Sequence, residues 1–167
     1  YDVESVGSVI AKGGRAVAGG IAGTNEADGV VDFSYSNSAV TSDGTASSGG
    51  LGGVVGYNTG GVYRIDSLGV TNGGDSGSSN VGGVIGINDG TMYNAYNESI
   101  ISGEQNVGGI IGVNHSGKTV SNVVNAANIT GTADSQYVGA SSAITAALCR
   151  MAATTAKSPV KPTSAAW

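Results

Sequence analysis

The chain is poor in the residues on which most redox, catalytic and disulfide-stabilised sites depend. Only 11% of its 167 residues are charged, and it has two prolines, one histidine, one cysteine and one tryptophan. Average soluble domains have about 25% charged residues. The cysteine, Cys149, lies near the C-terminus, so the preceding residues have no disulfide, and no apolar run reaches the roughly 18 residues of a membrane span. The sequence therefore predicts neither a disulfide framework nor a membrane span.

Positive charge is also scarce. All 12 acidic residues lie in residues 1–139, where the basic residues are Lys12, Arg15, Arg64 and Lys118. Nucleic-acid-binding domains cluster Lys and Arg on one face. Such an acidic segment gives no support to nucleic-acid binding.

Glycine, in contrast, is abundant and periodic. The 30 glycines include those of a seven-residue phrase, whose complete copies are GGIAGTN, GGVVGYN, GGVIGIN and GGIIGVN at residues 19–25, 52–58, 82–88 and 108–114. Gly139 opens a fifth copy, and successive first glycines are 33, 30, 26 and 31 residues apart. Repeats of about 20–50 residues are typical of solenoids and other arrays.

Each repeat has the features of three short strands separated by turns. The phrase itself is the first strand, a segment after a glycine turn is the second, and a short apolar stretch is the third. Aspartate or asparagine precedes glycine at several of the turns, and no window shows helical periodicity. Residues 1–139 are therefore predicted to form an all-β β-solenoid of about four coils, with a partial first repeat.

Equivalent residues of stacked coils are expected to form ladders, because each strand pairs with its counterpart one coil away. Apolar ladders are predicted at Val54, Val84 and Ile110, and at Val55, Ile85 and Ile111. Gly56, Gly86 and Gly112 are expected either to allow close backbone approach or to adopt a positive φ at a corner. Asparagine ends every complete phrase, and we predict an asparagine ladder of Asn25, Asn58, Asn88 and Asn114, with simple turn residues as the alternative.

The phrase G-G-hydrophobic-hydrophobic-G-x-N, followed by a turn and a second strand, resembles the GLUG repeat. GGVVGYNTGGVY, GGVIGINDGTMY and GGIIGVNHSGKTV carry the resemblance, while GGIAGTNEADGVV is looser at Ala22 and Thr24. The GLUG family is found in large bacterial surface proteins, including filamentous-haemagglutinin-like adhesins and the region outside the protease domain of streptococcal IgA-specific metallopeptidases. The resemblance covers residues 1–139 and implies an exported, cell-surface setting. It implies neither a ligand nor a catalytic residue.

Residues 140–167 depart from the repeat, because they contain nine alanines and no glycine. We interpret this tail as an out-of-frame translation of the next repeat. Back-translation with one G restored after the Gly139 codon gives GIIGYNSGTVSNGGNYGEVTGKTYVGGM, which is a complete repeat. Cys149 and Trp167 then have no evolved role. The alternative is a genuine cap, irregular or with a short Ala-rich helix over Ser141 to Ala156, since solenoids need capped ends.

Few residues match a catalytic or metal-binding pattern. His115 has no marked nucleophile or acid beside it and no H-E-x-x-H motif, so we interpret it as a solvated turn residue. Asp75, Asp89, Glu98 and Glu104 do not recur in register, which argues against a calcium-binding β-roll. We expect no catalytic residue, no metal and no cofactor.

Two surface hypotheses remain open. Asp2, Glu4 and Asp66 are able to cluster on one face, with solvated carboxylates as the default. Tyr57, Tyr63, Tyr93, Tyr96 and Tyr137 are candidates for an exposed stripe that stacks on sugars. Tyrosines that bury the ring at a coil edge and leave the hydroxyl in water are the alternative.

The sequence thus favours a non-enzymatic repeat segment of an exported bacterial surface protein, acting as an adhesin shaft, a spacer or an interaction surface. Two alternatives are a fragment of a β-helical polysaccharide-degrading enzyme and the accessory region of a surface metallopeptidase. The expected partner is a host glycan or protein, which the sequence does not identify.

Overall fold

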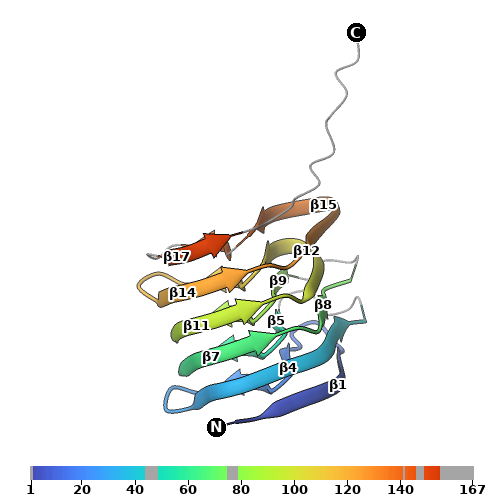
Figure 1. Cartoon of the computed structure of the whole chain (residues 1–167). Coiled ribbons are helices and arrows are strands. Elements are labelled where there is room, and N and C mark those ends of the chain that lie inside the picture. The colour runs from blue at the N-terminus through green and yellow to red at the C-terminus, as the bar shows by residue number, and fades with distance from the viewer. Residues whose placement is uncertain (1, 44–48, 75–78, 141, 146–148, 155–167) are drawn as a thin grey trace.

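The computed structural model describes residues 2–43, 49–74, 79–140, 142–145 and 149–154. Within these ranges all regular secondary structure is β-strand, and the strands form coils that stack along one axis (Figure 1). The predicted all-β β-solenoid is confirmed. Its strands are β1 (Glu4–Ala11), β2 (Ala18–Gly19), β3 (Ala22–Asn25), β4 (Val30–Ser42), β5 (Leu51–Gly52), β6 (Val55–Asn58), β7 (Gly61–Ser67), β8 (Val70–Asn72), β9 (Ser79–Gly82), β10 (Ile85–Asn88), β11 (Thr91–Asn97), β12 (Ile100–Gly108), β13 (Ile111–Asn114), β14 (Thr119–Asn125), β15 (Ile129–Gly139), β16 (Ser142–Thr145) and β17 (Cys149–Thr154).

The coils are joined by parallel pairing between equivalent strands. A five-stranded sheet has the order β16-β13-β10-β6-β3 and holds the end of each phrase. A twelve-stranded sheet forms the rest of the coil surface, and its main path runs β17-β14-β11-β7-β4-β8-β12-β9-β5-β2. The pairing is parallel because the chain completes a whole coil between paired strands, so each strand runs in the same direction as its counterpart.

The interior contains two groups of stacked apolar side chains. One lies between the five-stranded sheet and strands β7, β11 and β14, and it includes Val55, Ile85 and Ile111 in register. The other is formed by residues of β1, β4, β12 and β15 and of the short strands β2, β5 and β9. Small coils bury little surface by themselves, so the stability of each depends on its neighbours.

Strands β4, β7, β11 and β14 share one departure from regular strand geometry. In β7 the inward residues are Val62 and Ile65, three positions apart, and Arg64 between them has a φ of +49°. The equivalent residues Phe33, Asn94 and Asn122 have φ values of 48°, 56° and 53°. The left-handed residue places two successive side chains outside and then restores the inward alternation, so a bulge runs down one face of the solenoid.

The described part of the tail continues the solenoid. β16 pairs with β13, and β17 pairs with β14 with two shifts of register. Residues 142–145 and 149–154 are therefore strands rather than the short helix that the cap alternative places there. Their backbone groups pair with the strand edges of the preceding coil, which a helix does not do. Trp167 lies outside the described residues.

Candidate functional site

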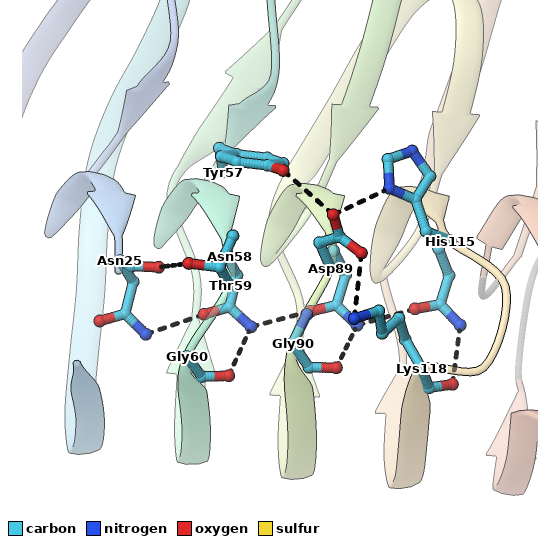
Figure 2. A network of polar contacts seen from close by, with 11 residues as sticks. Asn25, Tyr57, Asn58, Thr59, Gly60, Asp89, Gly90, His115 and Lys118 are labelled. Carbon is cyan, nitrogen blue, oxygen red and sulfur yellow. Dashed lines mark hydrogen bonds and ion pairs between the residues drawn. The ribbon is translucent and has the colours of Figure 1, made fainter. Parts of the chain in front are cut away.

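The four phrase asparagines form a continuous hydrogen-bonded column at the corner after the five-stranded sheet (Figure 2). Asn25 Nδ2 donates to Asn58 Oδ1 at 2.8 Å, Asn58 Nδ2 to Asn88 Oδ1 at 2.8 Å, and Asn88 Nδ2 to Asn114 Oδ1 at 2.7 Å. All four residues are buried. Each amide therefore links two coils in the interior, where an unpaired polar group is costly.

The same amides also close the turns. Asn58 Nδ2 donates to the carbonyl of Gly60 at 3.2 Å, and Asn88 Nδ2 to that of Gly90 at 3.3 Å. Asn114 Nδ2 donates to the carbonyl of Lys118 at 3.4 Å. The asparagines are thus both turn residues and a ladder, so the two interpretations of the sequence describe the same side chains.

The apolar and glycine positions of the phrase lie beside this column. Val54, Val84 and Ile110 are fully buried. The backbone N–H of Val54 donates to the carbonyl of Val84, and that of Val84 donates to the carbonyl of Ile110. Gly86 allows close approach: a Cβ there would lie 2.4 Å from the Leu51 backbone nitrogen. Similar close contacts occur at Gly56 and Gly112, and none of the three glycines adopts a left-handed φ.

A second polar column, which was not predicted from the sequence, joins the end of each second strand to the next phrase. Ser36 Oγ donates to the carbonyl of Gly53 at 2.7 Å, Ser67 Oγ to that of Gly83 at 2.7 Å, and Asn97 Nδ2 to that of Gly109 at 2.6 Å. Each acceptor is the second glycine of a phrase. In the sequence this column corresponds to a serine or asparagine at the end of each second strand. The residue type changes between coils, so the repeat of this position is not apparent from the sequence.

A cluster of polar side chains lies over the asparagine ladder and connects three coils (Figure 2). Its centre is Asp89, in the turn between β10 and β11. Tyr57 Oη donates to Asp89 Oδ2 at 3.1 Å, Lys118 Nζ lies 3.2 Å from Oδ1, and His115 Nδ1 lies 3.5 Å from Oδ2. We call these four residues the Asp89 cluster.

Electrostatics keep the carboxylate of the Asp89 cluster ionised. The hydrogen bond from Lys118, together with those from Tyr57 and His115, lowers the pKa of Asp89 against the opposing effect of partial burial. Burial and the neighbouring Asp89 carboxylate raise the pKa of Tyr57. The cluster therefore acts as a set of cross-coil polar contacts around one fixed negative charge. His115, interpreted from sequence as a solvated turn residue, is half-exposed but has this acidic neighbour.

The other acidic candidates are dispersed. Glu98 accepts a hydrogen bond from Tyr96, Glu104 lies on β12, and Asp75 lies outside the described residues. In the part of the chain that the structure describes, no group of three or more His, Cys, Asp and Glu residues is able to hold a metal ion.

The candidate tyrosines do not share one stripe. Tyr63 and Tyr93 are in register on neighbouring coils, with ring centroids 5.8 Å apart and an interplanar angle of 15°. Tyr96 is in the adjacent outward column, Tyr57 belongs to the Asp89 cluster, and Tyr137 is on β15. Glu4 and Asp66 are both in register with Tyr35, so these acids do lie on one face.

No protein-family model, curated protein or solved structure matches the chain. Among the described residues there is no helix of the length and hydropathy that a membrane crossing requires.

Proposed function

We propose that the chain is a non-enzymatic, GLUG-type repeat segment of an exported bacterial surface protein, and that it acts as a stiff shaft or spacer. The observation that carries this proposal is the unbroken asparagine ladder. It joins four coils through direct side-chain hydrogen bonds of 2.7–2.8 Å, in addition to the backbone pairing of the sheets.

The pattern of contacts suits an element that resists stretching along its axis. Neighbouring coils are bonded at their sheets, the four coils with complete phrases are also bonded at the asparagine column, and three of these are bonded at the Asp89 cluster. The length grows by about 4.8 Å per coil, because this is the separation of hydrogen-bonded strands. A segment of this kind sets the distance between the elements attached at its two ends without a change in cross-section.

Single-molecule pulling from the two termini tests the mechanical role. We expect resistance followed by stepwise release of about 100 Å of chain per coil, because a coil of 30 residues extends by about 3.3–3.6 Å per residue. Smooth extension without steps, as for an unfolded chain, would overturn the shaft.

The exported setting predicts that an antibody against the chain labels intact cells of the source organism, and labelling only after permeabilisation would contradict it.

A further inference from the structure

The bulged face carries a groove that runs across four coils. Its volume is about 430 Å³, and its walls are the left-handed column (Phe33, Arg64, Asn94, Asn122) and the next outward column (Asp66, Tyr96, Val124). Ala95, a small inward residue, also lines it. A second hollow of about 540 Å³, lined by Asp2, Val3, Glu4, Phe33 and Tyr35, meets the groove at Phe33. The groove therefore follows the register of the coils along the solenoid axis.

Two residues of the left-handed column are unusual for their conformation. Asparagine tolerates positive φ well, which accounts for Asn94 and Asn122, whereas bulky side chains rarely adopt it. Phe33 and Arg64 do so with φ of 48° and 49°. Strained backbone of this kind concentrates at functional sites. Phe33 is also 59% exposed, so its ring does not contribute to the core.

The side chains of the groove combine flat apolar surfaces with planar polar groups. The Arg64 guanidinium carbon lies 3.9 Å from the centroid of the Phe33 ring, and Arg64 forms an ion pair with Asp32. Asn122 donates to Asn94, which fixes two amides side by side. Sugar rings have an apolar face that stacks on aromatic rings, and adjacent hydroxyls that pair with amides, carboxylates and guanidinium groups.

From these observations we propose that the groove binds an extended, neutral polysaccharide lying along the solenoid axis. The groove positions recur every coil, about 4.8 Å apart, while the side chains at them differ. A linear polysaccharide likewise presents the same groups at each successive ring. This binding role is independent of the shaft role, because it depends on the outer face and not on the interior ladder.

Charge selects a neutral polymer over an acidic one. Among the described residues that line the groove, Arg64 is the only basic one, and Asp32 neutralises it. The Asp66 carboxylate remains exposed in the groove, and Glu4 lines the adjoining hollow. These carboxylates repel uronic acids and sialic acids. A basic peptide is the other ligand that this charge attracts, and the experiment distinguishes it from a polysaccharide.

The test is an NMR titration of the isotopically labelled chain with neutral hexasaccharides (cellohexaose, xylohexaose, mannohexaose), with an oligogalacturonate, and with an oligolysine peptide. We expect at least one neutral hexasaccharide to shift the resonances of groove residues, and the oligogalacturonate to shift none. Absence of any shift with all three neutral sugars overturns the proposal. So does an oligolysine peptide that binds the groove when the sugars do not.

The repeat itself supplies the variants. Phe33→Asn introduces the residue found at Asn94 and Asn122, and Tyr96→Val introduces the residue found at Val124, so both should fold. Each is expected to weaken binding by about tenfold or more, since each removes an aromatic contact. Tyr137→Asn is the matched control, because Tyr137 is also exposed and left-handed but lies on β15. Equal affinity of all three variants and the unmodified chain would locate the binding elsewhere and overturn the groove site.

Discussion

The second glycine of each phrase shows how single residues determine the stacking. A Cβ at Gly83 would lie 2.3 Å from both Asn97 Nδ2 and the Gly109 carbonyl oxygen. That space is already occupied by the hydrogen bond between the two groups. Glycine is required there because a polar side chain of the same coil reaches across to the next backbone, and not because of an unusual φ.

The third glycine of the phrase permits a matched comparison at the residue scale. Gly86→Ala is expected to destabilise the fold by about 3 kcal/mol, because its Cβ would meet the backbone of the preceding coil. Gly23→Ala, at the same phrase position, should cost less than about 1 kcal/mol, since its nearest neighbour is the Val17 carbonyl oxygen at 3.3 Å. Urea denaturation of both variants measures the difference. Equal losses of unfolding free energy in the two variants would mean that glycine is not required by contact with the backbone of the neighbouring coil.

At the scale of the elements, two turns and one strand from three coils meet at Asp89. The β10–β11 turn provides the carboxylate, β6 provides Tyr57, and the β13–β14 turn provides His115 and Lys118. Because these side chains are partly exposed, each contact is screened by solvent, and the cluster orients turns more than it stabilises the whole fold.

The lowered pKa of Asp89 predicts an acid-sensitive contribution to stability. A carboxylate whose pKa is depressed in the folded state stabilises the fold above the unfolded pKa, about 3.9, and loses this effect as the pH falls through the folded pKa. When the pH falls from about 5 to about 3, the free energy of unfolding of Asp89→Asn should therefore decrease less than that of the unmodified chain. The difference between the two decreases should be under about 1 kcal/mol. Denaturation midpoints across this range measure the effect. Lys118→Met, which removes the hydrogen bond with the largest effect on the pKa of Asp89, should flatten the acid dependence in the same direction; full acid dependence in Lys118→Met would contradict the assignment.

Considered as a whole molecule, the solenoid is a linear sum of coils. Each coil contacts only its neighbours, so one coil is removable if both cut ends are equivalent. Asn58 and Asn88 are in register, and residues 59–88 therefore make up one coil.

Excision of residues 59–88 should yield a folded solenoid that is shorter by one coil. We expect its free energy of unfolding to fall by about 2–4 kcal/mol, from typical stability per residue, and its denaturant m-value to fall with the smaller buried surface. Excision of residues 58–86 is the control, since it joins Tyr57 to Ile87 and puts one extra residue inside the phrase strand, which then cannot be in register with both β3 and β13. Circular dichroism and denaturation measure both variants. Loss of β-structure after the in-register excision, or normal folding after the other, would contradict this modular organisation.

The sequence sufficed for the architecture because the phrase repeats both its apolar and its asparagine positions. Val54, Val84 and Ile110 stack because they occupy the same position of successive phrases, and Asn58 and Asn88 do so for the same reason. The bulge at Phe33 and Arg64 was not predictable, because neither residue type favours positive φ.

Contacts between dissimilar residues were also beyond the sequence. The approach of His115 to Asp89 depends on the register between coils separated by 26 residues, and on how the turn after Asn114 folds back. The groove is likewise a property of neighbouring columns, in which only Asn94 and Asn122 share a residue type from coil to coil.

The asparagine ladder, finally, gives the solenoid a polarity. Asn25, Asn58 and Asn88 each donate to the asparagine of the next coil toward the C-terminus, so these amide dipoles align head to tail and reinforce one another. The two ends of the ladder are thus chemically unlike: Asn25 presents the acceptor side of an amide, and Asn114 presents the donor side. A further coil, whether from this chain or from another copy, extends the ladder only in the same orientation. An inverted copy would set donor against donor, so growth of such a structure is directional.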